Sequence, residues 1–226
     1  MGKIKGFIKS VTKRKNMPEH VDTGRRKMLA ITGALLASAA IDAEGRKIND
    51  SLAYIENKQI PKRKTAIVPS GAVSIGHFTK HCTRCQKCVE ACPSKVLRPS
   101  TDMTSFMMPM MSYEQGYCST ECTHCADVCP DGAILPITKA EKSSTQIGHA
   151  VWIQQNCIAA NGNKACDTCA KVCPVGAITM VTTNDDKMAP AVNTAHCIGC
   201  GACEHACTAY PFTAIYVEGH EIHQTI

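Results

Sequence analysis

The sequence predicts an α+β fold with little regular structure, built from two modules that are each a βαβ pseudo-repeat. Three observations support this. The 226 residues contain 16 cysteines but few aromatic side chains, namely one Trp, five Tyr and four Phe. The cysteines fall into four similar runs, and a turn followed by a short apolar segment comes after three of them. Because chains of this size usually bury large apolar side chains, the cysteines must organise the fold instead.

The first 43 residues carry the whole net charge. They contain nine Lys and Arg against three Asp and Glu, and the resulting +6 equals the formal net charge of the full chain. The remaining residues carry 16 basic and 16 acidic side chains and are neutral. A basic chain ordinarily suggests nucleic acid or an anionic membrane as a partner. Here the charge belongs to a leader, so we expect no nucleic-acid partner.

Residues 1–43 are expected to be a twin-arginine signal or anchor segment. Arg25 and Arg26 precede the apolar run Met28–Ile41, which ends in small residues. Basic residues, a short apolar run and small residues make a secretory signal, and paired arginines favour the twin-arginine route. The run is shorter than the about 20 residues needed to span a membrane. We expect export by the twin-arginine translocase to the periplasm, or to the outer face of the cytoplasmic membrane if an uncleaved signal tethers the protein.

Residues 44–76 are expected to be a helical segment and a linker. Asp50 can cap a helix whose apolar face runs from Ile48 to Ile55, and the helix stops before Pro61. The basic stretch Lys62–Lys64 is then expected to be a solvated linker. Residues 77–226 form the domain that contains the four cysteine runs.

All sixteen cysteines belong to runs that share one pattern. Each run has three leading cysteines and a fourth that lies four positions after the third, and Pro follows the fourth cysteine in three runs. The first run matches the bacterial pattern in which three thiolates bind one [4Fe–4S] cluster and the fourth binds a second cluster. We therefore expect four [4Fe–4S] clusters, with all sixteen cysteines as iron ligands. The runs are Cys82, Cys85, Cys88 and Cys92; Cys118, Cys122, Cys125 and Cys129; Cys157, Cys166, Cys169 and Cys173; and Cys197, Cys200, Cys203 and Cys207.

Other uses of cysteine explain this pattern less well. Disulfide scaffolds are usually short and do not repeat this spacing. Zinc sites use pairs of cysteines in fours, often with histidine, which leaves the third thiol of each run without a role. Covalent haem needs histidine directly after a C-x-x-C motif, and none of these cysteines is followed by one. Iron–sulfur clusters remain the interpretation that uses every thiol.

Short apolar segments flank the runs. Strands are expected upstream at 77–79, 150–153 and 191–193, and downstream after the turns in 130–135, 174–179 and 211–216. Strand, cysteine loop, short helix, turn and strand make up half of a bacterial ferredoxin. The sequence therefore predicts two bacterial-ferredoxin-like modules held together by four cubane clusters.

A methionine-rich segment separates the first two runs. It contains Met103, Met107, Met108, Met110 and Met111. We interpret it first as packing, with a partner-docking surface and Cu(I) binding as alternatives, because thioethers fill irregular gaps and also bind soft metals.

Several single residues near the runs have a plain interpretation and a functional one. His81 and His196 precede the first cysteine of a run and are expected at the surface, with a hydrogen bond to a cluster sulfur as the alternative. Trp152 is expected in the core, with shielding of a cluster from water as the alternative. His220 and His223 are expected to be solvated in a polar tail.

The chain carries no motif for a nucleotide or for hydrolysis. There is no GxGxxG after a strand, no GxxxxGK and no HExxH. We therefore expect an electron-transfer subunit of an oxidoreductase complex, with no catalytic site of its own.

The segments Val68–Val73, Phe78–Pro93 and Cys197–Glu204 resemble the NapG/MauM family of exported ferredoxin-type proteins, and the likeness extends over about residues 23–217. The resemblance implies a periplasmic protein with four [4Fe–4S] clusters. It implies electron flow from a membrane quinol-oxidising or ferredoxin-like integral membrane protein to a periplasmic reductase or redox carrier. The alternatives are the iron–sulfur subunit of a molybdenum-type oxidoreductase and a MauM-like maturation factor.

Resemblance to related four-run proteins also implies how the runs combine. The first run would pair with the last, and the two middle runs with each other. Cys207 would then join the first three cysteines of the first run, and Cys92 would join Cys197 and its neighbours. Cys173 would join the second run, and Cys129 the third. Pairing of runs that are consecutive in sequence is the alternative.

Overall fold

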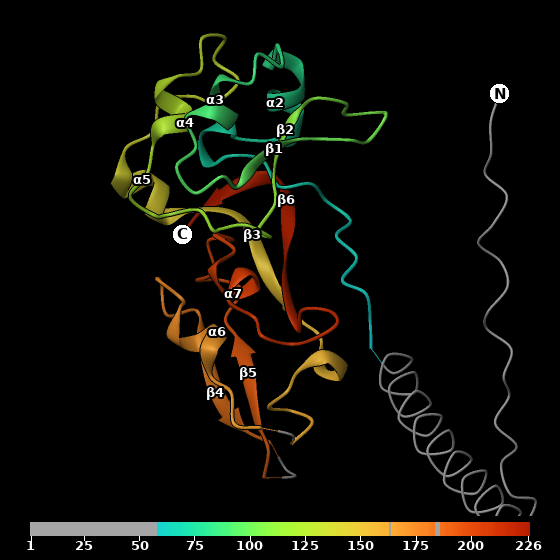
Figure 1. Ribbon diagram of the computed structural model, residues 1–226. Helices are drawn as coiled ribbons and strands as arrows, with labels where there is room; N and C mark the ends of the chain where they lie inside the picture. Colours follow the sequence, from blue (N-terminus) through green and yellow to red (C-terminus); the bar gives the residue numbers. More distant parts are fainter. Residues whose placement is uncertain (1–57, 163, 184–185) are drawn as a thin grey trace, which may run out of the picture. The chain divides into compact units, whose positions relative to one another are not determined.

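The computed structural model describes residues 58–162, 164–183 and 186–226 (Figure 1). The expected signal segment and the expected helix over 48–55 lie outside these residues. Within the described part of the chain, no helix has the length and apolar character needed to cross a membrane.

The described chain is mixed α and β with little regular structure, as predicted. Its three sheets are antiparallel pairs, namely β1–β2, β3–β6 and β4–β5. The helices are η1 (Ser70–Ala72), α2 (Ile75–His81), α3 (Lys87–Glu90), α4 (His124–Asp127), α5 (Lys139–Ser144), η2 (Gln154–Asn156), α6 (Thr168–Lys171) and α7 (Ala202–His205). The strands are β1 (Leu97–Pro99), β2 (Pro109–Met111), β3 (Thr145–Trp152), β4 (Ile178–Thr182), β5 (Met188–Val192) and β6 (Ile215–Thr225).

Two modules repeat the same order of elements. In the N-terminal module, defined here as residues 67–137, the hairpin β1–β2 connects the first and second cysteine runs. In the C-terminal module, residues 145–217, the hairpin β4–β5 connects the third and fourth runs. Each run contains a one-turn helix that carries its third cysteine. In three runs, Pro after the fourth cysteine prevents the helix from continuing.

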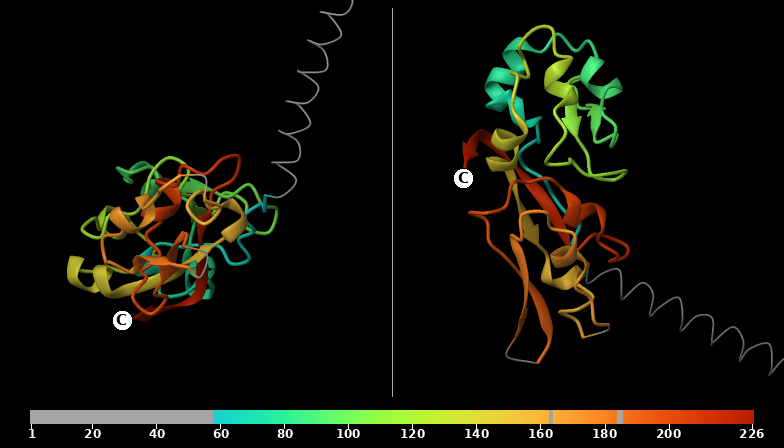
Figure 2. Two further views of the ribbon diagram at one scale, coloured as in Figure 1. Left: turned by 90° about the horizontal axis from the view of Figure 1, so that it is seen from below. Right: turned by 90° about the vertical axis from the view of Figure 1, so that its left-hand side faces the viewer.

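Strand β6 belongs to the cores of both modules. Its side chains alternate between buried and more exposed positions over its first half, as a half-buried strand requires. Ile215 packs in the core of the C-terminal module with Ile178, whereas Val217 packs in the core of the N-terminal module with Ile67 and Phe78. Both cores also contain cysteines. The right-hand view of Figure 2 shows the paired strands β3 and β6 side by side.

Two predicted strands are wrong, and both lie in the N-terminal module. Residues 77–79 belong to α2, because Ser74 caps the helix through its hydroxyl, which accepts a hydrogen bond from the His77 N–H, and Phe78 is buried. The apolar stretch after Pro130 forms no strand, although the Leu135 N–H donates to the Gly71 carbonyl. The strands predicted at 150–153, 191–193 and after the last two turns are confirmed by β3, β5, β4 and β6, although each observed strand extends three or more residues beyond the predicted segment.

The expected solvated linker is wrong at Arg63. Its guanidinium forms an ion pair with Glu204, with 2.9 Å between Nη2 and Oε2, and also donates to the Val217 carbonyl. The backbone N–H groups of Lys64 and Thr65 donate to the Glu218 carboxylate. The chain after residue 58 is therefore attached to the domain.

The expected solvated tail is also wrong, because β6 continues through it. The His220 ring lies against His149, with 2.9 Å between Nε2 and Nδ1. His223 Nδ1 lies 3.1 Å from the Ser70 carbonyl oxygen in the N-terminal module. The histidines pack because an antiparallel strand with a partner on one side extends nearly to the end of the chain.

Candidate metal centres

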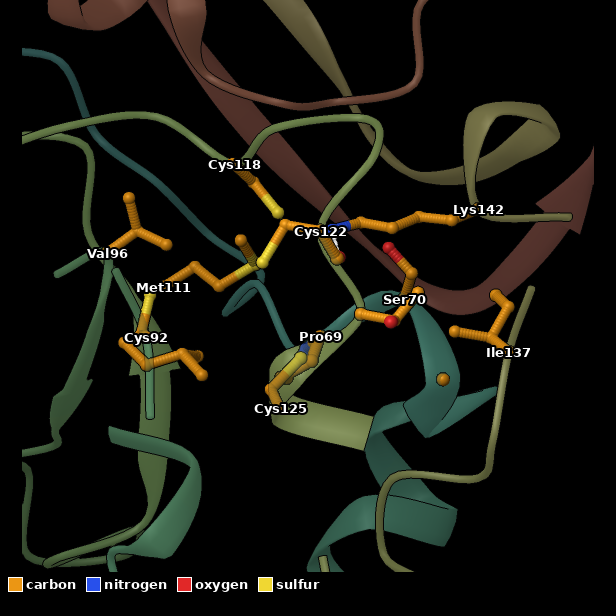
Figure 3. Close-up of a pocket in the computed structure, with 13 residues that line it drawn as sticks. Pro69, Ser70, Cys92, Val96, Met111, Cys118, Cys122, Cys125, Ile137 and Lys142 are labelled. Carbon is orange, nitrogen blue, oxygen red and sulfur yellow. Dashed lines mark hydrogen bonds between the residues drawn. The ribbon is translucent and has the colours of Figure 1, made fainter. Parts of the chain in front are cut away.

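The sixteen cysteines line four separate cavities, with four thiols around each. We name these sites I to IV. Site I contains Cys82, Cys85, Cys88 and Cys129; site II contains Cys92, Cys118, Cys122 and Cys125; site III contains Cys157, Cys166, Cys169 and Cys207; and site IV contains Cys173, Cys197, Cys200 and Cys203. Figure 3 shows the four thiols of site II around their cavity.

The pairing of runs inferred from four-run relatives is wrong. Cys92 lines a cavity with Cys118, not with Cys197, and Cys207 lines a cavity with Cys157, not with Cys82. Consecutive runs therefore combine, as in the alternative. The hairpins give the physical reason, because each antiparallel pair folds the two runs that it connects back toward each other.

Each module exchanges its fourth cysteines between its two runs. The third cysteine of a run lies on the one-turn helix, and the fourth lies one further turn along and faces the neighbouring site. Left-handed residues stand between the leading cysteines of two runs. These are Arg84 and Gln86 in the first run, and Gly199 and Gly201 in the last. Such turns direct successive backbone N–H groups into one concavity, where they stabilise negative charge.

Backbone N–H groups donate to cysteine sulfurs at three of the sites. Ile134 donates to Cys129 in site I over 3.4 Å, and Ala214 donates to Cys207 in site III over 3.2 Å. In site IV, Ala150 and Ala177 donate to two sulfurs, those of Cys197 and Cys173. These donors favour the thiolate form that iron requires.

Burial keeps the free thiols protonated in the absence of metal. It raises the pKa of Cys88, Cys169 and Cys200 to about 11 and that of Cys125 to about 12, and the neighbouring cysteines of the same site add to the rise. Four thiolates in one dry cavity repel each other. Binding a positively charged iron–sulfur core removes this cost by releasing the thiol protons.

Neighbouring sites are close enough for their thiols to interact. Cys88 of site I raises the pKa of Cys125 in site II, after the larger effect of burial. Cys169 of site III acts in the same way on Cys203 of site IV. Between the modules, the Cys118 N–H of site II donates to the Cys200 carbonyl of site IV over 2.9 Å. The spatial order of the sites is therefore I, II, IV, III.

Tyr113 lies at the junction of sites II and IV. Its side chain is 1% exposed, and its hydroxyl donates to the Gly199 carbonyl over 2.6 Å. A Cβ on Gly201 would lie 2.2 Å from the Tyr113 ring, so glycine is required there. The Arg63 guanidinium also lies over the Tyr113 ring, with its Cζ 5.9 Å from the ring centroid. Tyr113 could not be found from the sequence, because no cysteine spacing points to it.

Lys142 is a second residue that could not be found from the sequence. It lies on α5, outside every cysteine run, and it lines the cavity of site II. Its ammonium donates to the Cys122 carbonyl. Lys142 reaches site II only because α5 packs beside that site in the folded chain. The spacing of residues in the sequence therefore does not reveal it.

Of the other residues singled out from the sequence, some pack in the core and others lie at the surface. Met108 and Met111 are buried, which confirms packing for part of the methionine-rich segment, whereas Met103 is exposed. His81 is exposed, and its ring lies 2.9 Å from the His77 carbonyl oxygen rather than on a sulfur. His196 is exposed as well. Trp152 lines the cavity of site III, which favours the interpretation that it shields this site from water.

The residues at the four sites fit [4Fe–4S] clusters. Each cavity presents four thiols, and the remaining lining is mainly apolar at sites II, III and IV and mixed apolar and polar at site I. Among the described residues, no three His, Cys, Asp or Glu side chains close around a single metal ion. The four thiols instead surround a space between them, and backbone N–H groups or a lysine supply positive charge beside the sulfurs.

Comparisons with known proteins agree with this arrangement. Residues 81–134 match a family model described as a 4Fe-4S dicluster domain, and residues 164–210 match a second model with the same description. The first match contains the whole first and second runs, which is the pairing that the structure shows.

Full-length relatives give the same assignment. The ferredoxin-type protein NapF from Escherichia coli strains K12, O6:H1 and O157:H7 is 30% identical over 175 residues, which cover 77% of this chain and 99% of each relative. The ferredoxin-type assignment is confirmed, whereas the NapG/MauM branch named from the sequence is a neighbouring family that these relatives do not confirm. The chain belongs to the NapF family of ferredoxin-type proteins, and it is an iron–sulfur protein of electron transfer with two 4Fe-4S dicluster domains.

Proposed function

We propose that this protein holds four [4Fe–4S] clusters in sites I to IV and relays electrons along the order I, II, IV, III. The observation that carries the proposal is the contact between Cys118 and Cys200, which joins the two modules through ligands of sites II and IV. Without this contact, the two dicluster domains would form two separate relays. With it, neighbouring sites adjoin along the whole series.

The chain fixes the spacing of the sites, excludes water from them and stabilises charge on their sulfurs. When bound, a [4Fe–4S] cluster accepts and releases one electron with little change in shape. The cysteines fix the spacing between sites, and the backbone N–H groups at sites I, III and IV stabilise negative charge on the sulfurs. Trp152 covers part of site III, and Tyr113 excludes water between sites II and IV. No side chain has to move a proton.

Sites I and III are the ends of the series and the places where redox partners would exchange electrons. Cys85 of site I is exposed, so an electron can reach the surface there without crossing another site. The segment around it is basic, with Lys80, Arg84 and Lys87 all exposed. This charge suits a partner with an acidic docking surface.

The leader supports a periplasmic placement on the NapG/MauM pattern. Paired Arg25 and Arg26 before an apolar run are what the twin-arginine translocase uses. In this placement, a membrane quinol-oxidising or ferredoxin-like integral membrane protein supplies electrons, and a periplasmic reductase or redox carrier takes them. Replacing both arginines with lysine should leave the protein in the cytoplasm, as cell fractionation would show, and normal export of that variant would contradict the placement.

Iron and acid-labile sulfide analysis of the anaerobically purified protein tests the cluster content. Four cubes require about 16 iron atoms and about 16 sulfides per chain. About half of this content would mean that only one dicluster domain is loaded and would contradict a four-site relay. A colourless protein that contains zinc would contradict the function altogether.

A further inference from the structure

Lys142 is a charged side chain that the fold buries. It is 5% exposed and is the single Lys, Arg, Asp or Glu among the buried residues of the described chain. Its helix, α5, begins at a capping box formed by Thr138 and Glu141, which fixes where the helix starts. Lys142 then points from α5 into the cavity of site II, as Figure 3 shows.

Among the described residues, no carboxylate forms an ion pair with Lys142. The four ion pairs of the described residues involve Arg63, Arg98, Lys139 and Lys171, and none involves Lys142. Its ammonium donates to a neutral acceptor, the Cys122 carbonyl. An ammonium removed from water is costly unless an opposite charge lies nearby. The remaining candidates for that charge are the thiolates of site II.

Lys142 lies close enough to two thiols of site II to affect their pKa values. A hydrogen bond and the positive charge of Lys142 oppose the rise that burial causes in the pKa of Cys118. The same charge lowers the pKa of Cys125, again against a larger effect of burial. Lys142 therefore acts on two thiols that belong to site II and to no other site.

Site II also differs from the other three sites in its hydrogen bonds. Within the described residues, backbone N–H groups donate to cysteine sulfurs at sites I, III and IV, through Ile134, Ala214, Ala150 and Ala177. None of these hydrogen bonds reaches a sulfur of site II. Site II thus has a buried positive charge and no such donor, whereas the cations beside site I, Arg84 and Lys87, are exposed.

We propose that Lys142 is the counter-charge of the cluster in site II and raises the reduction potential of that cluster relative to the potential it would have without this charge. The inference rests on the proposed function, because it requires a cluster in site II. A reduced cluster carries one more negative charge than an oxidised one, so a fixed cation stabilises the reduced state more. Site II adjoins both site I and site IV, and its potential therefore controls the passage of electrons between the modules.

Two variants separate the charge from the hydrogen bond. Lys142→Gln keeps an N–H donor for the Cys122 carbonyl but removes the charge, whereas Lys142→Arg keeps both. Lys139→Gln is the matched control. Lys139 lies on the same helix, but it is exposed and its nearest carboxylate, that of Glu121, is 3.9 Å away at the surface.

The measurement is a redox titration of the full-length protein, followed by electron paramagnetic resonance. In Lys142→Gln, we expect the reduced-to-oxidised ratio of one cluster at fixed potential to fall at least tenfold, which is about 59 mV for a one-electron couple. The other three clusters should be unchanged, as should all four in Lys139→Gln. Lys142→Arg should stay within about threefold of the wild type. Loss of four irons from Lys142→Gln but not from Lys142→Arg would also support the assignment, because charge would then decide whether the cluster is held.

Three results would overturn the inference. One is a Lys142→Gln protein with full iron content and four unchanged potentials. Another is an equal shift in Lys139→Gln, because the effect would then be general surface charge. The third is equal iron loss in the Gln and Arg variants, because shape and not charge would then matter. A wild-type protein without iron would instead refute the proposed function and is distinguished before the titration begins.

Discussion

The N-terminal and C-terminal modules use the same arrangement of cysteines but surround them differently. Both combine two consecutive runs through a hairpin and exchange the fourth cysteines. Backbone N–H groups donate to sulfurs of both sites in the C-terminal module but of site I alone in the N-terminal module, where site II has the Lys142 ammonium instead. Spacing therefore determines which cofactor a loop can hold, whereas residues outside the cysteine runs supply its electrostatic surroundings.

The modules also differ at their outer edges. The paired strands β3 and β6 flank the two runs of the C-terminal module. The corresponding position before the first run is occupied by α2, and the last residues of β6 reach across to contact Ser74 and Ser70. Strand β6, which begins in the C-terminal module, thus supplies part of the scaffold of the N-terminal module. The predictions below test how far the two modules depend on each other.

The largest effect is expected from the loss of site II, because this loss separates the cluster of site I from the clusters of the C-terminal module. Cys118→Ala should reduce the iron content from about 16 to about 12 atoms and leave the cluster of site I without a neighbour. Cys85→Ala should cause the same iron loss at site I, but the other three clusters stay adjacent. Electron paramagnetic resonance of the reduced proteins distinguishes them, because an isolated cluster gives a signal free of magnetic coupling. Coupling that persists among all remaining clusters in Cys118→Ala would refute the order I, II, IV, III.

The next effect concerns the contact between Gly201 and Tyr113. Gly201→Ala should lower the melting temperature by about 10 °C, because left-handed backbone strain and overpacking each cost about 1–3 kcal/mol and 1 kcal/mol corresponds to about 2–4 °C in a chain of this size. Gly176 is the control, since it also has a positive φ but no atom within 4 Å of an added Cβ. Gly176→Ala should lower the melting temperature by about 4 °C. Equal losses would show that the junction is not tightly packed.

A smaller effect is expected for the hydrogen bond that crosses the junction. Tyr113→Phe removes the donor to the Gly199 carbonyl and leaves that buried acceptor unpaired, which costs about 1–2 kcal/mol, or about 2–8 °C in melting temperature. Tyr117→Phe, at an exposed tyrosine of the same module, should change the melting temperature by less than about 1 °C. If the two variants melt alike, the hydroxyl of Tyr113 does not help to join the modules.

The smallest effect is a pH dependence at the end of β6. Burial lowers the pKa of His223 from its ordinary 6.5, and the Ser70 carbonyl only partly opposes this. The unfolded chain therefore binds a proton more readily, and the native state loses stability as the pH falls below about 6.5. His223→Gln should reduce the drop in melting temperature between about pH 7 and about pH 5.5. The exposed His196 is the matched control, and an equal change in His196→Gln would remove His223 from the explanation.

Short-range features of the sites could be predicted from the sequence. The grouping of Cys82, Cys85 and Cys88 and the exchange of Cys92 to a neighbouring site follow from spacing along one loop and one turn of helix. The mixed α and β character with little regular structure also follows, since each element has to fit between cysteine runs.

Long-range features could not be predicted, and the reasons differ. The partner of Cys92 depends on a hairpin with weak strand signals, because β1 and β2 contain three residues each and both include Pro. The sequence predicts a strand at 77–79 because a short apolar segment has no distinctive period. The cap formed by the Ser74 side chain instead stabilises a helix there. Lys142 comes from an element outside every run, so only the tertiary fold reveals it.

Iron-edge anomalous diffraction from anaerobically grown crystals would locate the clusters themselves. We expect four cluster positions, each surrounded by the four cysteines of one site, with Cys92 and Cys118 on the same cluster and the clusters in the order I, II, IV, III. Fewer than four iron positions, or a cluster shared by Cys92 and Cys197, would contradict this arrangement.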